Sequence, residues 1–125
     1  MKIIKIKEFS NEYLDAIQIL IRLLTSEPLQ FTEADLRKLL ASDSSHLFLL
    51  MDDNDVVGIL TVGIYRSPTG TKAWIEDVVV DEVYRRMGLG RMLTQHAITC
   101  FSSRCCSYRA NMSRLPVLTA IHFLP

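Results

Sequence analysis

The stretch from residue 74 to residue 93 constrains the fold of this chain more than any other part of the sequence. A β-branched run ends in a polar turn, the turn carries Arg-x-x-Gly-x-Gly over residues 85–90, and a helical pattern follows. Backbone N–H groups at a helix start have no partner within the helix and lie at the positive end of its dipole. Glycine lets a phosphate approach the backbone because it has no Cβ atom. The order therefore predicts a pyrophosphate site, with a carboxylate pair, Glu76 and Asp77, on the strand that leads into it.

Composition narrows the class of protein. A chain of 125 residues suggests one domain. Fourteen basic and fourteen acidic residues cancel, so the net charge gives no reason to expect a nucleic-acid partner. No apolar stretch approaches the ~20 residues of a membrane span, and residues 1–8 lack the apolar core of an export signal. Three cysteines near the C-terminus and three scattered histidines lack metal-ligand spacing, so we expect no metal site and reduced thiols in a cytoplasmic protein.

Hydrophobic periodicity predicts the element order β-α-α-β-β-β-α. Alternation predicts a strand over residues 2–8, and helical spacing predicts a helix from an N-cap at Ser10 to about Ser26. Thr32 and Asp35 resemble a capping box that begins a second, short helix. Three meandering strands between helices favour an α+β domain over a doubly wound sheet. The remaining patterns predict strands over 46–51, 56–65 and 72–80, turns over 53–55 and 67–70, and a helix over 89–101 with Met92, Leu93, His96, Ala97 and Cys100 on one face.

This order, together with Arg85-Arg86-Met87-Gly88-Leu89-Gly90 and the strand Glu76-Asp77-Val78-Val79-Val80, resembles the GCN5-related N-acetyltransferases (GNAT). The family signature is Gln or Arg, two variable residues, Gly, one variable residue, and Gly or Ala, which residues 85, 88 and 90 match in register. The resemblance covers residues 1–101. It implies a three-layer α/β/α fold of the α+β class, with a mixed, mostly antiparallel sheet and helices on both faces. It also implies direct transfer of an acetyl group from acetyl-coenzyme A to a primary amine of a small molecule or peptide.

The resemblance also implies roles for individual residues. The family's central strand has a bulge whose free backbone groups hold the pantetheine arm, and an N–H near Val78 would stabilise the oxyanion. A carboxylate facing the acceptor would take the proton of the ammonium group. Glu76 is favoured over Asp77 for this role, because strand alternation lets only one of them face the cleft. The residues implied to hold the cofactor are Val78, Val79, Val80, Arg85, Arg86, Gly88, Leu89, Gly90 and Arg91.

Each of these residues also has an ordinary structural interpretation. Gly88 and Gly90 can simply end a loop and begin a helix, and the arginines beside them can form a solvated face. Glu76 can be a charged residue on a half-exposed strand. Trp74 and Tyr84 either line the cleft or pack at strand ends.

Residues 102–125 depart from the family pattern, which continues with a strand, a helix bearing Asn and a Tyr that often serves as general acid, and final strands. Tyr108 and Asn111 lie in no matching motif. A frameshift near Cys105 would explain the break, because residues 107–116 read one nucleotide forward permit a strand-like peptide. Residues 117–123 alternate as a strand does and are expected to cover the open sheet edge, within the chain or in a homodimer. The alternative function is therefore a truncated or frameshifted relative that folds and binds coenzyme A without turnover.

Overall fold

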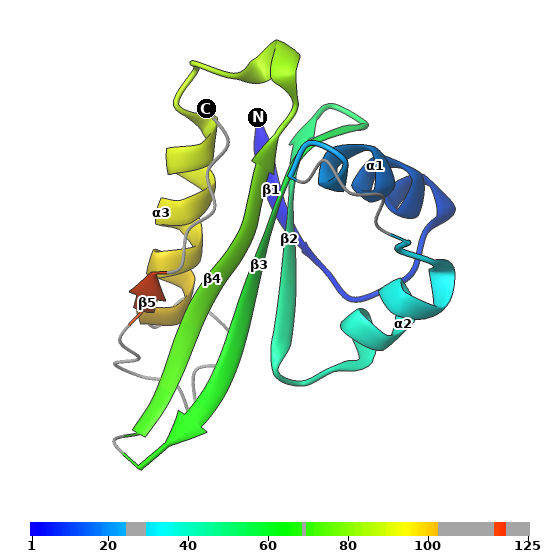
Figure 1. Ribbon diagram of the computed structural model, residues 1–125. Coiled ribbons are helices and arrows are strands. Elements are labelled where there is room, and N and C mark those ends of the chain that lie inside the picture. The colour runs from blue at the N-terminus through cyan, green and yellow to red at the C-terminus, as the bar shows by residue number, and fades with distance from the viewer. Residues whose placement is uncertain (25–29, 69, 103–116, 120–125) are drawn as a thin grey trace.

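A computed structural model describes residues 1–24, 30–68, 70–102 and 117–119. Its first four strands are antiparallel, and a short fifth strand runs parallel to the fourth, in the spatial order β1-β2-β3-β4-β5. The predicted order of helices and strands is confirmed. The elements are β1 (Lys2–Ile6), α1 (Asn11–Ile21), α2 (Glu33–Ala41), β2 (Ser45–Asp52), β3 (Asp55–Ser67), β4 (Gly70–Val80), the 3-10 turn η1 (Glu82–Tyr84), α3 (Leu89–Ser102) and β5 (Val117–Thr119) (Figure 1).

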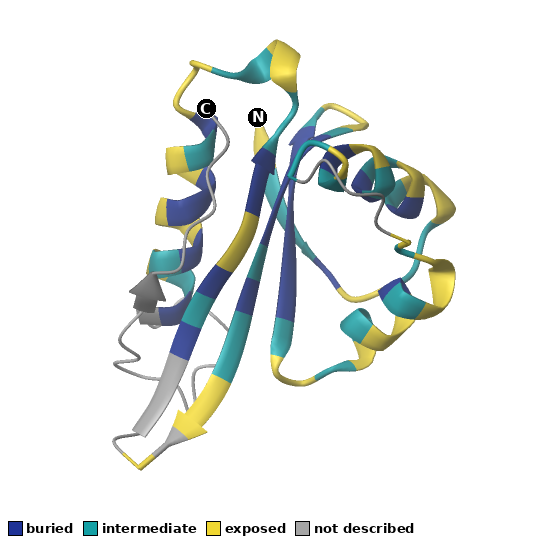
Figure 2. Cartoon of the chain, in the orientation of Figure 1, coloured by how far each residue is buried: buried dark blue, intermediate teal, exposed yellow. Residues whose placement is uncertain are grey.

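The sheet separates two layers of helices. Helix α3 covers one face, and helices α1 and α2 cover the other (Figure 1). Each face has its own hydrophobic core, with Phe48 and Ile75 beneath α3 on one face, and Leu49 of β2 together with Leu36 of α2 on the other. Buried residues accordingly concentrate along the strands and on the inward sides of the helices (Figure 2). The expected three-layer α+β architecture, with a mixed and mostly antiparallel sheet, is therefore confirmed.

The two N-terminal helices differ in how well the sequence defines their ends. The capping box of α2 is confirmed, because Thr32 Oγ1 accepts from the Asp35 N–H at 3.3 Å and Asp35 Oδ2 accepts from the Thr32 N–H at 3.0 Å. These hydrogen bonds lower the pKa of Asp35. Helix α1 ends at Ile21 rather than near Ser26, because the following amides turn to acceptors three residues back, as Leu23 N–H does to Leu20 O. No helix in the described part of the chain has the length and apolarity needed to cross a bilayer.

The buried face of α3 differs from the expected one. Leu89, Leu93, Ala97 and Phe101 are buried at intervals of four residues, whereas Met92 and His96 are exposed. The buried face is therefore displaced by about one residue around the helix axis from the face that we expected. The residues that pack directly on the sheet are those of the i, i+4 stripe. Met92 and His96 are consequently accessible beside the buried stripe.

The last described strand, β5, forms on the open edge of β4. Residues 117, 118 and 119 pair in parallel with Ala73, Trp74 and Ile75. The expected strand is confirmed over these three residues, within the same chain. Residues 120–123 lie outside the described residues, as do Cys105, Cys106, Tyr108, Asn111 and the region of the frameshift hypothesis. The homodimer stays a prediction.

His46 is a buried titratable group at the start of β2. Its ring lies 5.1 Å from the ring of Phe101, measured between centroids, and only 2% of the residue is exposed. Burial lowers the pKa of His46 to about 4, and the positive charges of Lys5 and Lys7 act in the same direction against a smaller opposing effect of Asp43. The folded state therefore favours the neutral imidazole.

We expect the protein to lose stability as the pH falls from about 6.5 towards about 4, because the unfolded chain binds a proton that folded His46 excludes. The contribution of this one group is about 3 kcal/mol across that range. Urea unfolding at about pH 7.5 and about pH 4.5 measures the difference, which should shrink in His46→Leu. His96→Gln, which replaces an exposed histidine, is the control and should retain the full pH dependence. A wild-type unfolding free energy that is flat over this range would contradict the prediction.

Candidate active site on the central strand and the glycine loop

The central strand β4 contains a bulge. Ile59 pairs with Val79 and Thr61 pairs with Glu76, so β4 has one more residue than β3 between these two pairs. Within this interval Asp77 has a φ of 56°, in the left-handed region that non-glycine residues rarely adopt. An extra residue in a bulge leaves the ladder, so its backbone groups remain unpaired. The bulge implied by the family resemblance is thus present next to the carboxylate pair.

The bulge changes which side chains share a face of the sheet. Ile75 and Val78 both belong to the core beneath α3, although they are three positions apart. A regular strand would place them on opposite faces. Glu76 and Asp77 are both exposed. Strict alternation, the reason given for placing only one of the two carboxylates in the cleft, is interrupted at this point, and which of them faces the acceptor stays a prediction.

Glu76 lines a pocket of about 430 Å³. Trp74 lies two residues earlier on β4 and lines the same pocket, whereas Tyr84 does not. The pocket is small enough that a bound ligand would lie close to the Glu76 carboxylate. Its other lining residues are Ser44, Ser45, Gly63, Ile64 and Tyr65.

The open edge of β4 lies directly beyond the bulge. Strand β5 pairs only with residues 73–75 of β4, so within the described residues the same edge has no strand neighbour from Glu76 to Val80. A free strand edge can pair with an extended ligand through main-chain hydrogen bonds. Val78 and Val80 lie on this stretch, as the resemblance implies for residues that hold the pantetheine arm.

Hydrogen bonds fix the chain between β4 and the glycine loop. The Asp81 N–H donates to Val57 O at 2.8 Å, and Asp81 Oδ1 accepts from the Val83 N–H at 3.0 Å. The Arg85 Nε donates to Val80 O at 3.2 Å. Arg85 therefore has a structural role, because its side chain folds back onto the end of the strand that precedes it.

A further hydrogen bond connects the glycine loop to the β2–β3 hairpin. The Tyr84 hydroxyl donates to Asp52 Oδ2 at 2.6 Å, and this hydrogen bond is the main reason why the pKa of Tyr84 is raised. No role at this site was expected for Asp52. The two residues are 32 positions apart, and no local pattern relates them.

In the described part of the chain, the first amides of α3 have no acceptor within the helix. The first hydrogen bond of the helix runs from the Met92 N–H to Gly88 O at 3.0 Å. Within the described residues, the amides of Leu89, Gly90 and Arg91 therefore have no helical acceptor. In the loop before the helix, both Arg86 and Gly88 adopt left-handed φ values, of 65° and 74° respectively. Successive amides in such a turn form a concave site for an anion.

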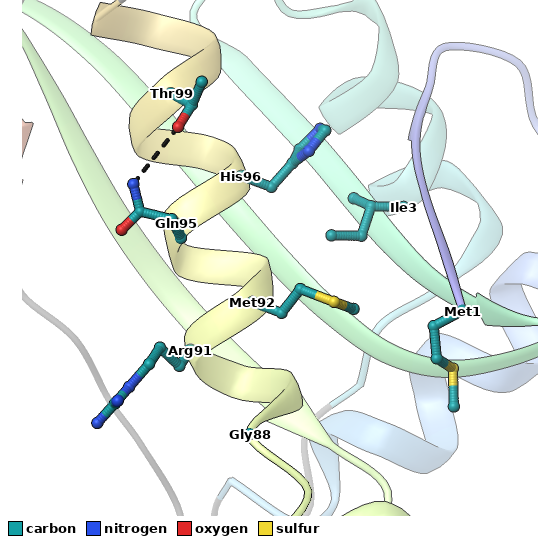
Figure 3. Close-up of a pocket in the computed structure, with 8 residues that line it drawn as sticks. All are labelled: Met1, Ile3, Gly88, Arg91, Met92, Gln95, His96 and Thr99. Atoms are coloured by element: carbon teal, nitrogen blue, oxygen red, sulfur yellow. Dashed lines mark hydrogen bonds between the residues drawn. The ribbon is translucent and has the colours of Figure 1, made fainter.

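The space beside Gly88 is accessible. Gly88 and Arg91 line a hollow of about 640 Å³ that extends along α3 and reaches Met1 and Ile3 at the β1 end of the chain. In Figure 3, His96 and Met92 point from α3 towards Ile3, whereas Arg91 projects from another side of the helix. The remaining lining residues are Met1, Gln95 and Thr99. The described residues contain no cluster of three His, Cys, Asp or Glu side chains placed to hold a metal ion.

Comparisons with known proteins agree with this fold. A model of the Acetyltransferase (GNAT) family matches residues 14–124. An aminoglycoside acetyltransferase from an uncultured soil metagenomic sample, solved with sisomicin, is 24% identical and has a TM-score of 0.71 over 94% of this chain and 75% of its own. A GNAT family acetyltransferase from Staphylococcus aureus is 22% identical, with a TM-score of 0.67 over 100% and 89%. Glucosamine-6-phosphate N-acetyltransferase from Arabidopsis thaliana is 16% identical, with a TM-score of 0.69 over 95% and 82%. No curated protein sequence matches the chain.

Substitutions at Gly88 and Arg86 should change the free energy of unfolding in opposite directions. Gly88→Ala adds a Cβ that meets no atom within 4 Å, so its cost is the backbone strain alone. Arg86→Gly relieves such strain. We expect Gly88→Ala to be less stable than Arg86→Gly by about 1–2 kcal/mol in urea unfolding. Equal stability of the two variants would contradict the loop geometry described here.

Proposed function

Because the chain belongs to the Acetyltransferase (GNAT) family, we propose that it transfers the acetyl group of acetyl-coenzyme A to a primary amine by direct attack. N-acetyl transfer is the general activity of this fold and family. Beyond this general activity, we propose that the acyl donor is acetyl-coenzyme A and that the amine attacks it without a covalent enzyme intermediate. We also propose a role for individual residues in this reaction.

The bulge in β4 supports this proposal more than any other observation. It interrupts the β3–β4 ladder within residues 76–80, where β4 also carries the exposed Glu76 carboxylate and, among the described residues, has no strand neighbour on its other edge. The pantetheine arm would lie along the edge at Val78 and Val80, where its amides can pair as an added strand does. The Val78 N–H would donate to the carbonyl oxygen as negative charge develops on it.

The glycine loop supports binding of the pyrophosphate. The amides of Leu89, Gly90 and Arg91 point out of the helix start, and the left-handed turn at Arg86 and Gly88 adds to the concave surface. Val79 is buried in the core and would position the neighbouring backbone rather than contact the ligand. Arg85 would position the loop through its hydrogen bond to Val80 O.

Glu76 is the proposed general base. A thioester supplies an activated carbonyl carbon, but an ammonium group cannot attack it until it has lost a proton. Glu76 is exposed in a pocket beside the bulge, so its carboxylate can accept that proton directly or through a water. Asp77 is exposed one position later and is the second candidate.

The acceptor is proposed to be a primary amine of a small molecule or peptide. The pocket at Glu76 has room for one amine-bearing group rather than a broad interface. Structural neighbours include acetyltransferases named for aminoglycosides, which are small-molecule amines. The alternative is a relative that binds coenzyme A without turnover.

Calorimetric titration with coenzyme A and a thiol-release assay over a panel of amines separate these two functions. We expect saturable binding together with thiol release that depends on the amine. Binding without release would favour the alternative, and absence of binding would contradict both.

Glu76→Gln should lower kcat by about 100-fold, because the amide cannot accept the proton of the ammonium group. Its affinity for coenzyme A should stay unchanged, since the loop amides do not involve this side chain. Asp77→Asn is the matched control and should lower kcat far less. Steady-state kinetics together with calorimetry test this assignment, and a larger loss in Asp77→Asn would reverse the roles of the two carboxylates.

A further inference from the structure

Strand β3 contains two glycines with opposite surroundings. A Cβ atom built on Gly58 would lie 3.1 Å from Val79 O and 3.2 Å from Leu50 Cβ, so close packing against the neighbouring strands requires glycine there. A Cβ atom built on Gly63 would meet nothing within 4 Å. Packing therefore explains the first glycine and leaves the second unexplained.

Backbone conformation does not explain Gly63 either. Among the described glycines, only Gly88 has a φ in the left-handed region. Gly63 thus occupies ordinary strand backbone, where a β-branched residue would favour the strand. Glycine inside a strand weakens it and often marks a place where a ligand approaches the backbone. Open space above Gly63 is consistent with this second explanation.

The register places Gly63 in the floor of the pocket at Glu76. Val62 is buried beneath α3 and Ile64 packs against the same core, so Gly63 between them belongs to the opposite face. On that face, Gly63 pairs with Ser45 on one side and Trp74 on the other. All three residues line the pocket, together with Glu76.

The missing side chain leaves a broad gap between two walls. Neighbouring strands are about 4.8 Å apart, so Ser45 and Trp74 stand roughly 10 Å apart across Gly63. Trp74 offers an aromatic wall and Ser45 a hydroxyl group on the other side. The backbones of these two residues thus flank Gly63, and the pocket of about 430 Å³ that they line has room for a six-membered ring, which an unbranched amine does not need.

We propose that Gly63 determines the size of the acceptor, and that the acceptor is a primary amine on a ring-sized group. The ring lies over Gly63 between Ser45 and Trp74, with its amino group at Glu76. This inference rests on the proposed function, because it takes the pocket at Glu76 as the acceptor site.

The series Gly63→Ala, Gly63→Val and Gly63→Leu tests the proposal. The probes are two ring-bearing amines, glucosamine and cyclohexylmethylamine, and two unbranched amines, 2-aminoethanol and propylamine. The wild type should use at least one ring-bearing amine. The kcat/KM for this ring-bearing amine should fall progressively along the series, by about tenfold or more in Gly63→Val, and it should fall much less for the unbranched amines. The melting temperature of Gly63→Ala should stay equal or rise, because its Cβ meets no atom within 4 Å.

Gly58→Ala is the matched control on the same strand. It should lower the melting temperature, because its Cβ meets the Val79 carbonyl, without changing the ratio of kcat/KM between ring-bearing and unbranched amines. An active wild type that rejects both ring-bearing amines would overturn the proposal. A ratio that is unchanged in Gly63→Val would also overturn it.

Calorimetric titration of the same amines separates this inference from the proposed function. Absence of thiol release with every amine contradicts the catalytic proposal. If a ring-bearing amine still binds the wild type and loses about tenfold in affinity in Gly63→Val, the size determinant stands as a feature of the binding pocket. If no ring-bearing amine binds, or if Gly63→Val binds it equally well, the inference is overturned independently of turnover.

Discussion

The left-handed backbone at Asp77 is the constraint on which the candidate site depends. One extra residue in β4 lets Ile75 and Val78 both pack beneath α3, and it leaves Glu76 and Asp77 exposed between them. A non-glycine residue in this conformation costs about 1–2 kcal/mol. The cost is sustained because buried residues on both sides of the bulge hold the strand in register. The same distortion removes backbone groups from the ladder and thereby makes them available to a ligand.

The glycine loop is connected to this distortion through a short series of hydrogen bonds. Asp81 bonds to the β3 backbone, Arg85 bonds to the carbonyl of Val80, and Tyr84 reaches Asp52 at the end of β2. The bulge and the start of α3 therefore belong to one framework rather than to two independent loops. A ligand that uses both a strand edge and a helix start requires this fixed separation, because a displaced catalytic group loses much of its effect.

Local patterns in the sequence were sufficient to predict the order of helices and strands and the position of the glycine loop. The capping box at Thr32 and Asp35 is confirmed because both partners lie within one helical turn. Residues 78–80 are all valine, so alternation cannot show which of them faces which core, and the bulge follows from the family resemblance rather than from the pattern. The face of α3 was misplaced because Met92 and His96 were grouped with residues that point inward, although both lie beside the buried stripe. The Tyr84–Asp52 tie and the open space over Gly63 depend on contacts between distant segments, which no local pattern encodes.

The extent of β5 is the last element that the candidate site requires. A parallel partner that continued along β4 beyond Ile75 would occupy the edge on which the bulge leaves its groups free. In the described residues, pairing with β5 reaches Ile75 and the bulge begins after Glu76, so strand pairing and the free edge lie next to each other without overlap. Within the described residues, the short parallel pair can then stabilise residues 73–75 of β4, while residues 76–80 have no strand neighbour on the same edge. An edge that is paired over one stretch and free over the next, in this described part of the chain, is the arrangement that the proposed transfer reaction needs, because an extended ligand pairs with a free strand edge.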